Sequence, residues 1–146
     1  MDADACPVKE EVYRVAERYG LAVTLVAGTW MRTPAAENIT LEVVSRGFDA
    51  ADDWIVAHAG RTDIVITTDI LLAARCLERG ACVLAPTGRA FTESNIGDAV
   101  ATRNLLSGMR GAGVETGGPE PFDARDRSRF LQALDRAVHA RRRAQA

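Results

Sequence analysis

The chain has 146 residues, of which 47% are hydrophobic and 5% aromatic, and a formal net charge of −2. This length favours a single domain, and the composition excludes a chain that is disordered throughout and predicts an aliphatic core. No apolar run approaches the roughly 18 residues of a membrane-spanning helix, and the first residues lack the basic and then apolar order of a secretory signal, so we expect a cytoplasmic protein with no membrane partner.

The two halves of the chain differ in charge. Residues 1–73 hold 12 acidic and 6 basic residues, whereas residues 74–146 hold 8 acidic and 12 basic residues. Such asymmetry indicates an acidic cluster that holds a cation and a basic surface that binds an anion. Charged helix faces that simply contact solvent are the alternative, and charge alone does not decide between the two.

Hydrophobic spacing predicts helices that alternate with strands along most of the chain. Pro7 begins the first helix, over residues 8–19, and Gly20 ends it. The further predicted elements are strands at 22–27 and 39–45, a helix at 50–59 with Asp49 as its N-cap and Gly60 as its end, a strand at 63–67, a helix at 70–77, a strand at 82–85, and helices at 93–110 and 123–142. This alternation predicts a three-layer α/β/α sandwich with a mainly parallel sheet.

In such a sheet, ligands bind outside the carboxyl ends of the strands, so the acidic residues can be sorted by edge. Asp2 and Asp4 precede the first helix, Asp69 follows the strand at 63–67, and Asp49, Asp52 and Asp53 follow the strand at 39–45. We expect all of these at the carboxyl edge. Asp63 begins its strand, so we place it at the opposite edge and exclude it.

Several carboxylates at one edge repel one another, and a bound Mg²⁺ or Mn²⁺ relieves that repulsion. Such an ion lowers the pKa of a bound water and neutralises charge on a phosphodiester. The alternative is helix capping, which we favour for Asp49. For Asp2, Asp4 and Asp69 we favour metal binding, because two acids in the order Asp-x-Asp before a helix exceed what one cap requires.

Basic residues near the same edge are candidates to bind the phosphates of RNA or DNA. Arg89 follows the strand at 82–85, and Arg103 and Arg110 lie on one face of the next helix. Asn95, near the start of that helix, is a candidate either to cap the helix or to donate to a phosphate.

Several stretches together resemble the YaiI/YqxD family of small bacterial proteins, and the match runs nearly end to end. They are DADACPVKEEV, GFDAADDWI, DIVITTDILLAARCLERGA, GRAFTESNI, RNLLSGMR and GGPEPFDARDRSRFLQALD. The resemblance implies a single PIN-like domain over residues 1–146 and a nuclease-like site, since PIN-like domains gather acids at strand carboxyl ends around Mg²⁺ or Mn²⁺. It places the first-strand acid of such sites on Asp2, with Asp4 beside it, and the acid of the Thr-x-Asp pattern on Asp69. Asp52 is the third position.

The chain departs from the family pattern at two places. A short apolar strand precedes DADACP in the family, whereas this chain opens at Met1 and Asp2, so its central strand is reduced to a tail. Either the start is assigned too late or a deletion removed the strand. We favour the first, because the neighbours of a missing strand would be left with unmade hydrogen bonds, and we expect upstream codons for an apolar tripeptide to pentapeptide. Leu71 replaces a proline of the family pattern, which removes rigidity from the helix start and no ligand.

These observations lead to one preferred function and two alternatives. We expect a Mg²⁺- or Mn²⁺-dependent nuclease in which Asp2, Asp4 and Asp69 are catalytic and Asp52 helps to hold the metal. A haloacid-dehalogenase-like phosphatase would use the Asp-x-Asp pair for nucleophile and acid/base, although the only lysine, Lys9, comes too early for that scheme. A non-catalytic nucleic-acid-binding module is the third hypothesis. The apolar helix faces are sufficient for a homodimer.

Overall fold

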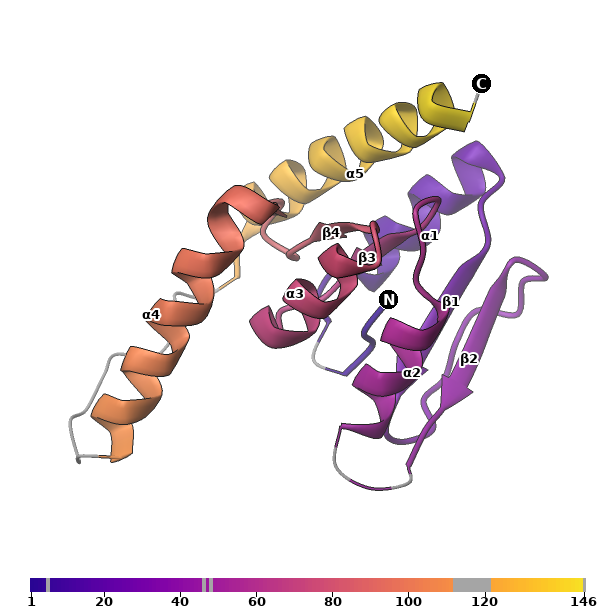
Figure 1. Cartoon of the computed structure of the whole chain (residues 1–146). Coiled ribbons are helices and arrows are strands. Elements are labelled where there is room, and N and C mark those ends of the chain that lie inside the picture. Colours follow the sequence, from indigo (N-terminus) through magenta and orange to yellow (C-terminus); the bar gives the residue numbers. More distant parts are fainter. Residues whose placement is uncertain (5, 46, 48, 112–121, 146) are drawn as a thin grey trace.

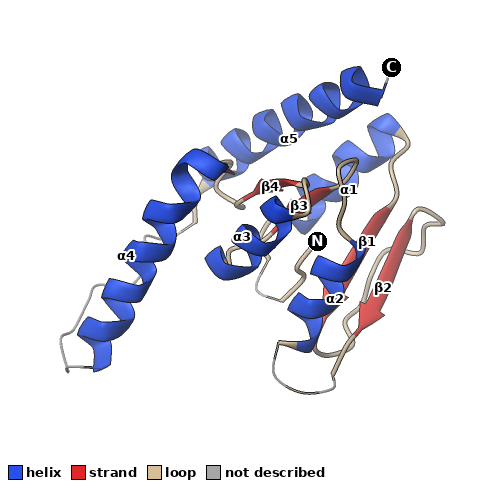
Figure 2. Ribbon diagram, in the orientation of Figure 1, coloured by secondary structure: helices blue, strands red, loops and turns tan. Residues whose placement is uncertain are grey.

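The computed structural model describes the chain except for residues 5, 46, 48, 112–121 and 146 (Figure 1). Its secondary structure is α/β (Figure 2). In chain order the elements are α1 (Lys9–Tyr19), β1 (Val23–Ala27), β2 (Ile39–Val43), α2 (Ala50–His58), β3 (Ile64–Ile66), α3 (Ile70–Glu78), β4 (Cys82–Leu84), β5 (Ala90–Phe91), α4 (Glu93–Gly111) and α5 (Ala124–Gln145). The predicted α/β class and the order of the predicted elements are confirmed.

The ends of the elements follow local residue chemistry. α1 ends at Gly20, whose φ of 64° is the left-handed conformation that glycine adopts without strain. α2 ends one residue earlier than predicted, because Ala59 is already extended and Gly60 does not form the cap. β5 was not predicted, since a strand of two residues is too short to show a period in the sequence.

The first three residues bridge two small sheets. β1 pairs in parallel with β2, and β3 pairs in parallel with β4, which is antiparallel to β5. The backbone N–H of Asp2 donates to Ile66 O at 2.9 Å, that of Ala3 donates to Val26 O at 2.9 Å, and that of Val26 donates to Met1 O at 2.9 Å. Residues 1–3 therefore occupy the position between β1 and β3 that was expected for the end of a central strand.

A cavity of about 460 Å³ begins beside Met1 and lies between the amino-terminal parts of β1 and β3. Val23 and Ile64 line it from the two strands, and Val12 and Val138 line it from α1 and α5. The Met1 ammonium donates to Thr24 O at 2.8 Å, and burial lowers its pKa. The two sheets are thus bridged near the carboxyl ends of β1 and β3 and separated by this cavity nearer their amino ends.

Alternate strand residues belong to two separate hydrophobic clusters. Leu25, Ile66 and Leu84 pack with α1 and α5, where Phe130 is fully buried. Val26, Val65 and Val83 pack with α2 and α3. Helices therefore cover opposite faces of the strands, and the strand ends remain available at the edges.

The two longest helices differ in how they contact the rest of the chain. α4 has 19 residues and packs against α3, with its far end extending beyond the other elements in Figure 1, whereas α5 has 22 residues and packs against α1. Among the described residues, no helix is both long and apolar enough to cross a bilayer. The GGPEPF stretch between α4 and α5 lies almost entirely outside the described residues.

Candidate acidic site at the sheet edge

Asp2 and Asp4 are brought to the carboxyl edge by the backbone pairing of residues 1–3. Asp2 lies between the ends of β1 and β3, because its N–H bonds Ile66, the last residue of β3. Asp4 is exposed, and its Oδ2 accepts a hydrogen bond of 3.0 Å from the N–H of Gly28, the residue after β1. The two carboxylates are therefore anchored to the strand ends that the parallel arrangement predicted.

Thr67 connects Asp2 with Asp69. Its hydroxyl donates to Asp2 Oδ2 at 2.8 Å and accepts from the N–H of Asp69 at 3.0 Å. Thr67 is 2% exposed, so both bonds are shielded from water. Burial raises the pKa of Asp2, while the hydrogen bond from Thr67 opposes that rise. The sequence analysis assigned Thr67 no role in the nuclease site. A threonine at the end of a strand, two residues before an acid, could have indicated this role.

Asp69 is the N-cap of α3. Its Oδ1 accepts from the N–H groups of Leu71 at 2.9 Å and Leu72 at 3.2 Å, which satisfies two donors that the first helical turn leaves unpaired. Asp69 therefore caps a helix, as the capping alternative predicted. It does not exclude a second role for the carboxylate, and metal binding by Asp69 stays a prediction.

Asp52 comes to the same edge from the first turn of α2. Burial, followed by the charges of Asp69, Asp2 and Asp49, raises the pKa of Asp52 to about 6. Its neighbour Asp53 instead forms an ion pair of 2.9 Å with Arg75 on α3. The structure thus separates the two adjacent acids, with Asp52 among the carboxylates of the edge and Asp53 in a link between helices.

The predicted capping role of Asp49 is wrong. Asp49 stands at the N-cap position of α2, but its side chain makes no capping hydrogen bond and its backbone is left-handed, with φ of 61°. A residue in this conformation does not direct its side chain back onto the first helical turn as an extended N-cap does. Asp49 contributes instead to the negative charge around Asp52.

The edge therefore collects five of the six acids predicted there, from three parts of the chain: Asp2, Asp4, Asp49, Asp52 and Asp69. The sixth, Asp53, pairs instead with Arg75 on α3. Asp63 lies at the start of β3, where its carboxylate accepts from the N–H of Gly60 at 2.9 Å, so its assignment to the other edge is confirmed. In the described part of the chain, no three His, Cys, Asp or Glu side chains already form a group that could hold a metal ion.

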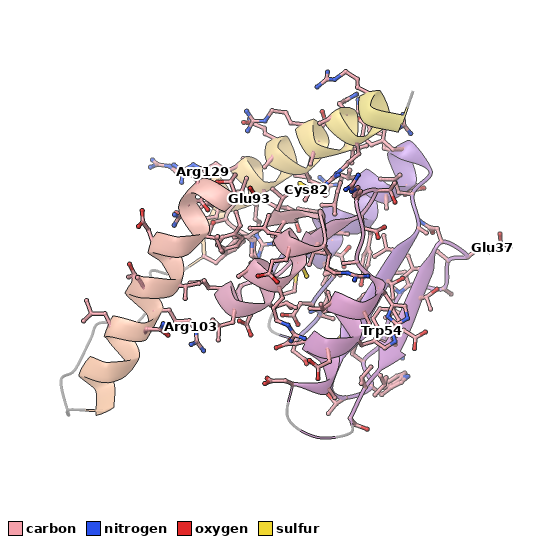
Figure 3. The ribbon with its side chains drawn as sticks, viewed as in Figure 1. Glu37, Trp54, Cys82, Glu93, Arg103 and Arg129 are labelled. Atoms are coloured by element: carbon pink, nitrogen blue, oxygen red, sulfur yellow. The ribbon has the colours of Figure 1, made fainter. Side chains whose placement is uncertain are left out.

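The predicted phosphate-binding residues do not form one cluster. Arg89 is exposed in the turn after β4, and Arg103 is exposed on the projecting helix α4 (Figure 3). Asn95 takes part in a capping box at the start of α4, since Thr92 Oγ1 accepts from Asn95 N–H at 3.3 Å and Asn95 Oδ1 accepts from Thr92 N–H at 2.9 Å. Its Nδ2 donates to Ala90 O at 3.0 Å. Arg110 lies in the last turn of α4, and its side chain is outside the described residues.

Comparison with protein families decides the relationship that the motifs indicated. The model of the family described as "Uncharacterized BCR, YaiI/YqxD family" matches residues 1–140. The chain belongs to the YaiI/YqxD family.

Among YaiI/YqxD relatives, a "UPF0178 protein" of Nitrobacter winogradskyi is 56% identical over 144 residues, which cover 99% of this chain and 92% of the relative. A "UPF0178 protein" of Brucella ovis is 53% identical over 145 residues, which cover 99% of this chain and 90% of the relative. No solved structure is significantly similar to the chain.

Proposed function

We propose that this YaiI/YqxD protein is a divalent-cation-dependent nuclease that hydrolyses phosphodiester bonds of RNA or DNA, built as a single PIN-like domain with a three-layer α/β/α arrangement. The observation that carries the proposal is the gathering of carboxylates at one sheet edge, where hydrogen bonds hold Asp2, Asp4 and Asp69 in place. Burial raises the pKa of Asp52 at this edge to about 6, and the like charges of Asp69, Asp2 and Asp49 add to that rise. Mutually repelling carboxylates at a ligand-binding edge are typical of functional sites.

The donors at this edge fit Mg²⁺ or Mn²⁺. They are carboxylate oxygens, the ligands that both ions prefer, and they carry an excess of negative charge that a cation would neutralise. Asp2, Asp4, Asp52 and Asp69 are the residues that would hold the ion. When bound, it would supply activation of a water and neutralisation of phosphodiester charge.

The residues around the acids have supporting roles in this proposal. The hydrogen bond from Thr67 fixes the carboxylate of Asp2, and bonds to the first turn of α3 fix that of Asp69. Preorganised carboxylates lose less freedom when a cation binds than freely rotating ones do. Burial of Thr67 keeps water away from the hydrogen bond that orients Asp2.

The two alternatives differ in how well the contacts support them. A phosphatase of the haloacid-dehalogenase type wants a lysine beside the Asp-x-Asp pair, but Lys9 donates to Cys6 O at 3.1 Å at the start of α1. A non-catalytic nucleic-acid-binding module has more support, because the cap formed by Asp69 explains that residue without chemistry. The experiment must therefore separate binding from cleavage.

The test is cleavage of labelled single-stranded RNA and DNA in Mn²⁺ or Mg²⁺ by the wild type, Asp69→Asn and Asp63→Asn. Asn is as good an N-cap as Asp, so Asp69→Asn removes the charge and keeps the α3 cap. Asp63→Asn makes the same chemical change at the opposite edge. We expect cleavage by the wild type and Asp63→Asn, and a loss of at least about 100-fold in Asp69→Asn. No cleavage of either polymer by the wild type would refute the nuclease proposal.

A further inference from the structure

A hollow of about 360 Å³ lies between α5 and the turn that follows β4. Its lining consists of Thr87, Gly88, Arg89, Arg129, Gln132 and Arg136. Three arginines thus line one concave surface to which no acidic residue of the described part of the chain contributes. Such an arrangement attracts anions, because like charges gathered in a concave surface reinforce one another.

The backbone of the turn fixes Arg89 beside α5. The N–H of Gly88 donates to Ala85 O at 2.9 Å, and the N–H of Ala85 donates to Arg89 O at 2.8 Å. Gly88 has φ of +89°, and a Cβ at this position would lie 2.7 Å from the carbonyl carbon and oxygen of Arg129. The turn therefore packs directly on the α5 backbone, which only a glycine with this conformation permits.

The other lining residues share one face of α5, since Arg129, Gln132 and Arg136 are three and seven positions apart. The helix is anchored by Phe130, which is fully buried, so the position of this face is set by the core. Arg129, labelled in Figure 3, contacts Asp126 at 3.8 Å but its side chain is 67% exposed. Arg89 and Arg136 form no ion pair with any described residue.

The hollow adjoins the edge that holds the acids. β3 and β4 are parallel neighbours, so the turn after β4 leaves the sheet at the same edge as Thr67 and Asp69, which follow β3. Neighbouring strands lie about 4.8 Å apart. A polyanion that places one phosphate in the hollow therefore binds on the side of the sheet that holds the acids.

We propose that this hollow binds a backbone phosphate of single-stranded nucleic acid through Arg89, Arg129 and Arg136. Guanidinium groups suit this ligand because they donate two parallel hydrogen bonds to phosphate oxygens. The inference rests on the proposed function for the choice of nucleic acid as the ligand. Of the residues that the sequence predicted to contact phosphate, the hollow contains Arg89, and it adds Arg129 and Arg136.

The test measures binding without cleavage. A fluorescent single-stranded RNA is titrated in EDTA at several salt concentrations with the wild type, the triple variant Arg89→Ala/Arg129→Ala/Arg136→Ala, the matching triple Lys variant, and Arg32→Ala. Arg32 is an exposed arginine in the loop between β1 and β2, far along the chain from the hollow, and serves as the control. Circular dichroism checks that each variant is folded.

For single strands, each phosphate contact contributes a slope of about −0.7 in the dependence of log affinity on log salt. At 0.1 M salt this corresponds to about fivefold for the one phosphate in the hollow, so we expect the triple Ala variant to lose at least about fivefold and its slope to fall by about 0.7. The triple Lys variant should keep most of the slope, and Arg32→Ala should match the wild type.

Equal binding by the wild type and the triple Ala variant would overturn the inference, as would a wild type that does not bind the RNA. Inorganic pyrophosphate is titrated in parallel. Arginine-dependent binding of pyrophosphate without arginine-dependent binding of RNA would also overturn it, because the hollow would then serve a small phosphate. Binding is read in EDTA, so a failure of the nuclease proposal leaves this result unaffected.

Discussion

Replacing Asp52 with Asn removes one negative charge from the acidic edge and barely changes the shape of the side chain. In the folded chain, burial and then the charges of Asp69, Asp2 and Asp49 raise the pKa of Asp52 from the 3.8 of a free aspartate to about 6. Between these two pH values the folded chain binds more protons at this residue than the unfolded chain does. Stability of the wild type therefore falls as pH rises from about 4 through 6, and the Asn variant escapes that loss.

The size of the effect follows from the shift. A shift of roughly two pKa units would be worth about 3 kcal/mol at 1.36 kcal/mol per unit if the charge were fully shielded. Asp52 is only partly buried, so solvent screening lowers this to about 1 kcal/mol. Loss of a favourable charge in the first turn of α2 subtracts a few tenths, about 0.3 kcal/mol. Above pH 7 we expect Asp52→Asn to melt about 2 °C higher than the wild type.

Thermal unfolding in EDTA from pH 4 to pH 8 measures this difference. The two proteins should have similar melting temperatures at pH 4 and diverge as pH rises through 6. Asp53→Asn is the control, because it removes a neighbouring charge that pairs with Arg75, and it should gain no stability at high pH. A difference between Asp52→Asn and the wild type that does not change with pH, or a less stable Asn variant at pH 8, would refute the electrostatic argument.

Three further substitutions test the contacts around the two sites. Thr67→Val keeps the shape of the side chain but leaves Asp2 and the N–H of Asp69 without their partner, so the free energy of unfolding in urea should fall by about 1–3 kcal/mol. An unchanged unfolding midpoint would contradict the two hydrogen bonds. Gly88→Ala places a Cβ against the Arg129 backbone and puts alanine in a left-handed conformation, so it should lower the free energy of unfolding in urea by about 2–4 kcal/mol. An unchanged free energy of unfolding would mean that the turn does not pack on α5. Asn95→Ala removes the side-chain bonds to Thr92 N–H and Ala90 O that complete the capping box of α4, and it should cost about 1 kcal/mol without weakening RNA binding. A clear loss of RNA affinity would instead support its predicted phosphate contact.

The sequence predicted the elements well because their signals are local. Hydrophobic period and the turn residues Pro7 and Gly20 marked α1 to within one residue. The carboxyl-edge rule then brought Asp2, Asp52 and Asp69 together with no knowledge of contacts, because all parallel strands end at one edge. The same rule correctly set Asp63 apart.

Other features depend on distances that no period in the sequence encodes. The prediction that Asp49 caps α2 was wrong because the Asp49 backbone is left-handed, and nothing in the sequence indicates the φ of an aspartate. The pairing of Asp53 with Arg75 depends on how α2 and α3 lie together. The arginine hollow needed the close approach of Gly88 to α5, which joins residues 41 positions apart and is visible only in three dimensions.

The cavity beside Met1 could not be predicted from the sequence either. The sequence indicated that residues 1–3 are the end of a central strand, and the pairing with Val26 and Ile66 agrees. The volume of about 460 Å³ between β1 and β3 is a property of how the helices close over the two sheets.

The central claim is that the acidic edge binds a divalent cation, and calorimetric titration of Mn²⁺ tests it most directly. Wild type, Asp69→Asn and Asp63→Asn are titrated under identical conditions. The account predicts binding by the wild type and Asp63→Asn with a dissociation constant on the order of micromolar, and affinity at least about 10-fold weaker in Asp69→Asn. Absence of Mn²⁺ binding by the wild type, or equal weakening by Asp63→Asn, would contradict the account and leave the cap of α3 as the role of Asp69.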